Sequence, residues 1–390
     1  MSCNIYIFGD LHFPRGGASA NYVELLAQAL SIQNMNVCVI STGNKQATDE
    51  DYNNLKRHSI RFSEIIPSAQ KINRHMELNY RMGKLIEEKI LEDDPVGKVV
   101  LIAYNTNPYT LKHMFSFAKR NRMIICGCIT EQLPREMFSI DIRGYFEYKK
   151  YIRATTKILP KFDLVLPISR YLEAFYEKKG ANTFLLPILA EVDKIPSYSS
   201  KRGGKRKFII PASGKMKDEF TSALKGFIEI HKELEDKIEL HVTGYSDEQV
   251  ALLCPESKLL INKSIFCHGW LKYNELMLLY DKMDFLVIAR KTNQMTLANF
   301  PSKVPEVMCH GVIPVVSKVG DYTDLLLVDN VNSFIFSGCD YKQCAAALRK
   351  AVMMDATKRM EMSSNAIETV KEKLNPCEWG EKLASVLERI

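Results

Sequence analysis

The sequence lacks any apolar run that approaches the ~20 residues needed to span a bilayer. No basic segment precedes the apolar residues Asn4–Gly9, so we expect them to form a strand and not a signal peptide. The ten cysteines include no Cys-x-x-Cys pair and are expected to be reduced, mostly buried thiols. Together these absences predict a cytoplasmic protein.

Patterns typical of cofactor and metal sites are absent or weak as well. The dinucleotide fingerprint Gly-x-Gly-x-x-Gly does not occur with its spacing. One Asp-x-Asp match, Asp49-Glu50-Asp51, has polar neighbours and no apolar strand before it, so we expect a solvated loop there. His268 has no cluster of partner ligands. We therefore expect neither a metal nor a cofactor.

The composition bounds the class of protein. At 390 residues the chain is too long for one ordinary core, so two domains are expected. A hydrophobic content of 46% beside 25% charged residues is that of a soluble globular protein. The net charge of +7 fits anionic substrates, a lipid surface or neither, and we expect no nucleic-acid partner.

Both halves of the chain show an alternation of strands and helices. Apolar strands at 4–8, 37–41 and 98–103 alternate with helical patterns, and the alternation restarts at 207–210 after a linker rich in Ser, Gly, Lys and Arg. This pattern predicts an α/β protein with parallel sheets. The predicted parts are a first Rossmann-like domain at 1–196, a second at 207–364, and a C-terminal helix at 365–390. The helical tail should break at Asn375-Pro376.

The stretch Asn299–Gly311 is the most informative part of the sequence. Pro301 suits the first position of a helix that Gly311 would end, and the apolar run after it predicts a buried strand. In that setting Lys303 could reach a phosphate at the helix start, and Glu306 could accept two hydrogen bonds from a ribose diol. The alternative is that Lys303 and Glu306 form only a solvated surface pair.

This stretch resembles the C-terminal signature of the glycosyltransferases of family 4, the "group 1" glycosyltransferases. Their pattern is a Glu, seven residues, a second Glu, then a Gly and Pro-Val-Val; Glu306, Gly311 and Pro314–Val316 occupy its second half. The first Glu should stand at Ala298 and is absent. The Phe-Pro-Ser-Lys variant at 300–303 is similar to a branch found in surface-polysaccharide synthesis. The resemblance implies the GT-B fold, in which two Rossmann-like domains face a central cleft and the C-terminal helix crosses back onto the first domain.

The resemblance also implies a set of site residues. In the family the second Glu holds the donor ribose, which assigns that role to Glu306. Basic residues after the first strand of the second domain lie against the donor pyrophosphate, and Lys217 is the better match for them, with Lys215 the second choice. Cys267–Leu271 is similar to the nucleobase loop. The implied donor-binding residues are Gly16, Gly17, Ser213, Gly214, Lys215, Lys217, His268, Gly269, Arg290, Ser302, Lys303 and Glu306.

The activity implied by the resemblance is transfer of a hexose from a nucleoside-diphosphate sugar to a hydroxyl acceptor, with retention at the anomeric carbon. The acceptor would be a saccharide or a lipid-linked saccharide, and no metal is required if cations and helix ends neutralise the diphosphate. Two alternatives stay open. The missing Glu at Ala298 fits a non-catalytic nucleotide-sugar-binding partner in a polysaccharide-assembly complex, and a nucleotide-sugar epimerase could have the same two-domain shape.

Glu131 and Lys217 are the expected catalytic residues. Many family members carry a His at a strand end of the first domain, facing the donor sugar, whereas here the strand at 123–130 runs into Glu131. A carboxylate there could accept hydrogen bonds from sugar hydroxyls or stabilise positive charge at the anomeric carbon. The alternative is that Glu131 only caps the helix or turn that starts near Pro134.

The segment Ile142–Lys161 is basic, with six cationic residues against the single Glu147. Tyr145, Tyr148, Ile152 and Leu159 recur at roughly helical spacing on another face. Such a helix could contact the inner face of a membrane. The alternative, which we favour from sequence, is a helix packed on its own sheet with its charges in water.

Overall fold

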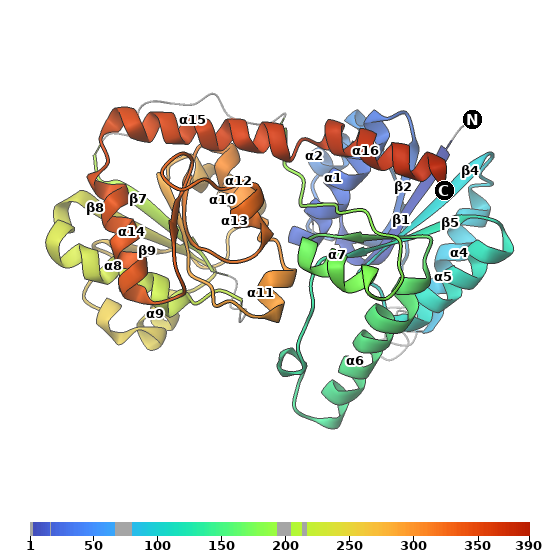
Figure 1. Cartoon of the computed structure of the whole chain (residues 1–390), viewed down its shortest axis with the longest axis horizontal. Helices are drawn as coiled ribbons and strands as arrows, with labels where there is room; N and C mark the ends of the chain where they lie inside the picture. The colour runs from blue at the N-terminus through green and yellow to red at the C-terminus, as the bar shows by residue number, and fades with distance from the viewer. Residues whose placement is uncertain (1–2, 16, 67–79, 193–203, 213–216) are drawn as a thin grey trace. The chain divides into compact units, whose positions relative to one another are not determined.

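The structure is a computed structural model that describes residues 3–15, 17–66, 80–192, 204–212 and 217–390. The chain divides into two compact units, of which unit 1 comprises Met1–Leu189 with Pro376–Ile390 and unit 2 comprises Ala190–Asn375. Each unit is built on one six-stranded sheet in which every strand pair is parallel (Figure 1). The prediction of two parallel α/β domains is therefore confirmed.

Unit 1 has the strand order β3-β2-β1-β4-β5-β6. Its central strands are near-continuous apolar runs, as expected where helices cover both faces of a parallel sheet. The elements are β1 (Cys3–Phe13), α1 (Ala18–Ile32), β2 (Asn36–Gly43), α2 (Asp49–Arg57), β3 (Arg61–Glu64), α4 (Met82–Glu92), β4 (Lys98–Tyr104), α5 (Pro108–Arg120), β5 (Ile124–Ile129), η2 (Arg135–Met137), α6 (Ile142–Arg153), η3 (Ala154–Ile158), η4 (Leu159–Lys161), β6 (Leu164–Pro167), α7 (Arg170–Glu177) and α16 (Pro376–Arg389).

Unit 2 repeats this plan with the strand order β12-β11-β10-β7-β8-β9. One side of its sheet packs on α8 and α14 through a core that includes Phe208, Phe227 and Leu348. The elements are β7 (Arg206–Pro211), α8 (Phe220–Leu234), η6 (Glu235–Lys237), β8 (Ile238–Thr243), α9 (Asp247–Leu253), η7 (Pro255–Ser257), β9 (Ile265–Cys267), α10 (Tyr273–Tyr280), β10 (Phe285–Ile288), α11 (Gln294–Ala298), α12 (Lys303–Cys309), β11 (Ile313–Ser317), α13 (Asp321–Leu325), β12 (Phe334–Phe336), α14 (Tyr341–Met353) and α15 (Ala356–Lys373).

The helical tail belongs to both units. It breaks before Pro376, as predicted, so that α15 stays with unit 2 while α16 packs on α1 of unit 1. Trp379 joins a small core with Leu25 and Ala29 of α1. The two helices approach so closely that a β-carbon on Gly380 would collide with the carbonyl oxygen of Ala29. The predicted return of the C-terminal helix to the first domain is confirmed.

The structure differs from the expectations for unit 1 at two places. Asp49-Glu50-Asp51 is not a loop but the first turn of α2, because Thr48 and Asp51 form a capping box and the carboxylates favour a helix start. The strand β3 (Arg61–Glu64) was not predicted, since it is an edge strand without an apolar run. Of the helix predicted at 69–92 the structure has α4 from Met82, and residues 67–79 lie outside the described part.

The basic helix α6 does not pack on its sheet, which corrects the interpretation favoured from sequence. Gly144 is its one fully buried residue, and Figure 1 shows the helix projecting from the body of unit 1. The chain reaches α6 through the long connection after β5 and returns to the sheet through η3 and η4.

Candidate functional site

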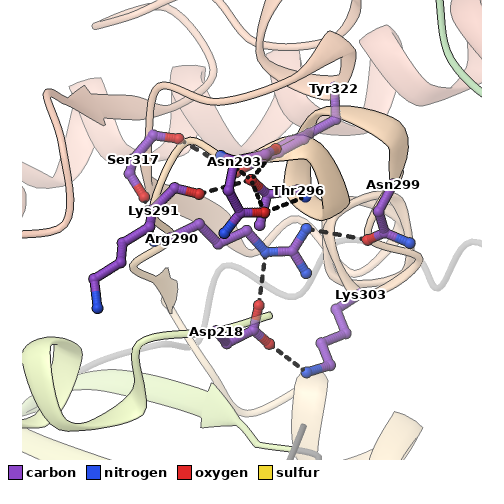
Figure 2. Close-up of polar contacts among 9 residues, drawn as sticks. All are labelled: Asp218, Arg290, Lys291, Asn293, Thr296, Asn299, Lys303, Ser317 and Tyr322. Atoms are coloured by element: carbon purple, nitrogen blue, oxygen red, sulfur yellow. Dashed lines mark hydrogen bonds and ion pairs between the residues drawn. The ribbon is translucent and has the colours of Figure 1, made fainter. Parts of the chain in front are cut away.

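The strand orders place a topological switch point in each sheet. In unit 2 the chain runs outward from β7 through β8 to β9, and then returns to the other side of β7 to form β10. Ligands of open parallel sheets bind at the carboxyl ends of the strands where this reversal occurs. The residues that follow β7 and β10, Asp218 and Arg290, meet there in an ion pair between Arg290 Nε and Asp218 Oδ1 at 2.6 Å (Figure 2).

Arg290 is held on several sides. Its side chain is 3% exposed, its Nη1 donates to Asn299 Oδ1 at 3.2 Å, and its guanidinium lies 6.0 Å from the ring centre of Tyr322. Its backbone N–H donates to Ser317 Oγ at 2.6 Å, which ties the end of β10 to the end of β11. Because the guanidinium is enclosed in this way, it has little freedom to move toward a ligand. Its role is therefore to position the side chains around it.

Asp218 bridges Arg290 to a second cation. Its Oδ2 accepts a hydrogen bond from Lys303 Nζ at 3.0 Å, so one carboxylate holds both side chains (Figure 2). Burial would raise the pKa of Asp218, but the charges and hydrogen bonds of Arg290 and Lys303 outweigh it, and the pKa lies below its ordinary value. The cluster therefore carries a net charge of about +1, with the Lys303 side chain 20% exposed.

The segment between Arg290 and Lys303 is fixed by its own hydrogen bonds. Asn293 and Thr296 form a reciprocal capping box at the start of α11, and Thr296 Oγ1 also donates to the carbonyl of Lys291 at 2.6 Å. Ala298, where the family pattern has its first Glu, ends α11 and is fully buried. The next residue, Asn299, directs its side chain to Arg290.

Glu306 and its helix differ in detail from the prediction. Because the residue before a proline avoids helical angles, Asn299 and Phe300 stay outside the helix, and α12 begins at Lys303 with Ser302 as N-cap, two residues after Pro301. Burial raises the pKa of Glu306 to about 7, while Lys303 and a hydrogen bond with Ser302 act in the opposite direction. Lys303 and Glu306 are therefore not a solvated surface pair, because each has a partner inside the unit.

The other residues implied for donor binding fall in three groups. Ser213, Gly214 and Lys215 of unit 2, and Gly16 of unit 1, lie outside the described residues. Lys217 lies in the turn before Asp218 and is partly buried. His268 and Gly269 follow β9, where the backbone N–H of Gly244 donates to the carbonyl of Gly269 at 2.6 Å.

His268 is the end of a polar chain that sequence reasoning did not find. Lys207 Nζ lies 3.0 Å from Glu239 Oε1, Glu239 lies 3.2 Å from His241 Nε2, and His241 Nδ1 lies 2.9 Å from His268 Nε2. With Glu239 ionised, His241 Nε2 must donate to it, so His241 Nδ1 accepts from His268 Nε2. The chain thus leaves Nδ1 of His268 as an acceptor, and burial lowers the pKa of both histidines.

Unit 1 has its switch point between β1 and β4. Gly17 precedes α1 as its N-cap, and Glu131 lies two residues beyond the end of the neighbouring strand β5, partly buried. The backbone carbonyl of Glu131 accepts from the Tyr151 hydroxyl at 3.1 Å. The N-cap of the η2 turn is Pro134, whose side chain supplies no capping hydrogen bond, so both interpretations of Glu131 stay predictions.

Two buried side-chain oxygens lie in the loops at the ends of β4 and β5. Thr106 Oγ1 and Gln132 Oε1 have no hydrogen-bond partner in the part of the chain that the structure describes. Buried polar atoms are rarely left unpaired, so these positions are suited to accept or donate hydrogen bonds to a polyhydroxyl ligand. The sequence offered no signal for either residue beyond its place after a strand.

The residues that the structure describes give little support for a metal site. Among those residues no group of three His, Cys, Asp or Glu side chains could hold a metal ion. Asp51 of the Asp-x-Asp match is paired with Arg15, whose Nε lies 3.4 Å from its carboxylate. No helix described here is long and apolar enough to cross a membrane.

Comparison with known proteins finds one family model that resembles most of unit 2. Residues 192–369 match the family model described as "Glycosyl transferases group 1". No curated protein sequence matches the chain.

Solved structures identify the fold of the whole chain. A glycosyltransferase from Rickettsia africae ESF-5 is 12% identical with a TM-score of 0.69, and the match covers 100% of this chain and 98% of that chain. HepE from Anabaena, in complex with UDP and glucose, is 14% identical with a TM-score of 0.70, covering 99% and 100%. Sucrose-phosphate synthase from Thermosynechococcus elongatus is 13% identical with a TM-score of 0.71, covering 100% and 99%. Likeness at these identities shows the fold, and it confirms the GT-B-like fold expected from sequence.

Proposed function

We propose that this chain is a glycosyltransferase that moves a hexose from a nucleoside-diphosphate sugar to a hydroxyl of a saccharide or lipid-linked saccharide, with retention. The match of residues 192–369 to the group 1 glycosyltransferase model supports the reaction class. HepE, of the same fold, binds UDP and glucose, and this supports a nucleotide-sugar donor here. The Phe-Pro-Ser-Lys sequence at 300–303 supports a place in polysaccharide or glycolipid synthesis.

The observation that carries the proposal is the cluster of Asp218, Arg290 and Lys303 at the switch point of unit 2. In the reaction the bond between the anomeric carbon and the diphosphate oxygen breaks, and negative charge grows on the diphosphate. A preorganised cation stabilises that charge without having to reorient during the reaction. Lys303 is the partly exposed cation of the cluster, and Asp218 and Arg290 keep it in place.

Glu306 and the loop after β9 complete the donor side of the proposal. As an anion, Glu306 would accept hydrogen bonds from both ribose hydroxyls. His268 Nδ1, left as an acceptor by the chain through His241, would receive an N–H of the base. Lys217, in the turn before Asp218, would add a cation near the diphosphate.

Unit 1 carries residues that would bind the transferred sugar or its acceptor. Glu131 follows a strand at the carboxyl edge of the sheet, where its carboxylate would accept hydrogen bonds from sugar hydroxyls or stabilise positive charge at the anomeric carbon. Thr106 and Gln132 offer unpaired oxygens in the adjacent loops. Gly17 keeps the backbone open at the start of α1, as the glycine loop of the resemblance requires.

A binding assay followed by a turnover assay tests the proposal. A thermal-shift panel of nucleoside diphosphates and nucleotide sugars should show stabilisation by mass action, about 2.7 kcal/mol at 100 times the dissociation constant. The stabilising donor is then supplied with saccharide and lipid-linked acceptors, and the glycosylated product and its anomeric configuration are measured. A panel in which no nucleotide stabilises the protein contradicts the proposal.

Two other functions are distinguished by the same assays. A non-catalytic nucleotide-sugar-binding partner is favoured by Ala298 in place of the first Glu, and it would give stabilisation without product. An epimerase of the same fold would interconvert the free donor when no acceptor is present.

A further inference from the structure

The helix α6 presents an exposed face that nothing in unit 1 covers. Ile142, Tyr145, Phe146, Lys149 and Arg153 are all exposed and follow one another at i, i+3, i+4, i+7 and i+11, the spacing of a single helical stripe. Ile140, just before the helix, is 100% exposed, and Ile142 is 77% exposed. We call these six residues the α6 stripe. Its apolar residues gather at the amino-terminal end, and its cations lie along the later turns.

The opposite face of α6 holds the helix in place. Tyr148 and Tyr151 pack against Phe138, with ring centres 5.4 and 5.7 Å apart. The Tyr151 hydroxyl accepts from the backbone N–H of Leu133 at 2.9 Å. Gly144 lies so close to Ser139 that a β-carbon there would collide with its carbonyl oxygen. The stripe is therefore exposed on a helix whose orientation is fixed, and not on a frayed segment.

Positive charge predominates on the later turns of α6, while the carboxylate of Asp141, the N-cap, lies at the amino-terminal end and accepts a hydrogen bond from the backbone N–H of Gly144. Of the six cations between Ile142 and Lys161, Lys150 is paired with Glu147 at 3.0 Å. Lys149 and Arg153 form no ion pair with any residue that the structure describes, and Lys149 Nζ lies 5.3 Å from the ring centre of Tyr145. The surface thus offers unpaired positive charge directly behind four exposed apolar side chains.

We propose that the α6 stripe docks unit 1 on an anionic lipid surface. Ile140, Ile142 and Phe146 enter the boundary between head groups and acyl chains, Tyr145 lies at the head-group level, and Lys149 and Arg153 meet the anionic head groups. A helix with apolar and aromatic residues beside unpaired cations has the chemistry of an interfacial helix. The cores of protein interfaces are depleted in charge, which argues against a protein partner on this face. The docking goes beyond the transfer reaction and does not rest on it.

Flotation of the full chain with vesicles tests the docking. The vesicles are phosphatidylcholine alone or mixed with phosphatidylglycerol, at low and high salt and without nucleotide. The wild-type chain should float with the anionic vesicles at low salt and much less with the neutral ones. Replacing Lys149 and Arg153 by Gln should lower the partition constant about fivefold for each cation. Ile142→Ser with Phe146→Ser should lower it at least tenfold, because two buried apolar side chains are lost.

Matched variants in unit 2 control for unspecific effects. Leu259 is 78% exposed, and Lys258 and Lys263 are exposed, so Leu259→Ser and the pair Lys258→Gln with Lys263→Gln should float like wild type. Because all replaced side chains are exposed, the melting temperature and nucleotide stabilisation should stay unchanged in every variant. This separates the docking from the proposed function, which fails by loss of nucleotide binding.

Three outcomes overturn the docking. One is the absence of flotation with anionic vesicles, and another is equal flotation with neutral ones. The third is flotation that survives both α6 variants. Self-association that the α6 variants abolish, without vesicle binding, would assign the stripe to a second copy of the chain instead.

Discussion

Nucleotide affinity should depend on pH through Glu306. Burial raises the pKa of this carboxyl to about 7, so about one tenth of the free protein carries the anion at pH 6 and about nine tenths at pH 8. If only the anion accepts both ribose hydrogen bonds, affinity for UDP should rise on the order of tenfold between these pH values, or about 1.4 kcal/mol. Calorimetric titration at pH 6, 7 and 8 measures it.

A variant separates this effect from the ionisation of the nucleotide. The terminal phosphate of a diphosphate titrates with a second pKa of about 6, which by itself raises affinity with pH. In Glu306→Gln the phosphate still ionises but the carboxylate is gone. The ratio of wild-type to variant affinity therefore cancels the effect of the phosphate and reports on Glu306 alone. The ratio should grow with pH, and proton release on binding near pH 7 should be larger in wild type than in Glu306→Gln. A constant ratio refutes the ribose assignment.

The same raised pKa has a consequence for stability. The pKa of Glu306 in the folded protein lies above its ordinary value of 4.5, so the folded protein binds this proton more tightly than the unfolded chain does. The contribution of the protonated carboxyl to the free energy of unfolding is therefore complete below pH 4.5 and is lost as the pH rises through about 7. The rise of this pKa from 4.5 to about 7 corresponds to at most about 3 kcal/mol in the free energy of unfolding. Glu306→Gln should therefore melt at a higher temperature than wild type at pH 8 and at a similar one at pH 4.5, whereas the exposed Glu372→Gln should show no such difference. Equal melting at pH 8 would show that burial of Glu306 is tolerated without cost.

Three further outcomes follow from the site. Asp218→Asn should lower the free energy of unfolding by about 2–4 kcal/mol, because Arg290 stays buried without its counter-ion, and denaturant titration measures it. Glu131→Gln should lower turnover roughly 10²–10³-fold with donor affinity and melting temperature unchanged; near-normal turnover removes Glu131 from the catalytic residues. A chelator should leave transfer intact, and loss of activity restored by manganese or magnesium would contradict a metal-independent reaction.

The fold was predictable because a parallel strand that is covered by helices on both faces appears in the sequence as a short run of apolar residues. Val99–Ala103 and Ile313–Ser317 are such runs, and both are strands in the structure. The edge strand β3 is polar or half-exposed, so no run marks it. At α2 the polar composition alone indicates a loop, but the Thr48–Asp51 capping box decides the conformation there.

The site was predictable only where its residues are close in sequence. Lys303 and Glu306 stand three apart in one motif, and the resemblance locates both. The Asp218–Arg290 pair joins residues 72 positions apart, and only the strand order brings the ends of β7 and β10 together. The sequence did give one indication of Asp218, because a carboxylate beside Lys217 in the loop after a strand needs a cationic or hydrogen-bonding partner. For α6 the spacing of aromatic and basic residues fits a packed helix and a projecting one equally, and the exposed Ile140 and Ile142 distinguish them.

The division of the helical tail between the two units bears on how the chain folds during synthesis. All of unit 2 has been translated once Asn375 has been added, whereas unit 1, although begun first, still lacks α16. Until then the face of α1 around Leu25 and Ala29 has no partner from Trp379 and stays open to water or to a chaperone. The domain made first is therefore the one completed last, and a released chain that ends at residue 375 would contain all of unit 2 but lack the last helix of unit 1.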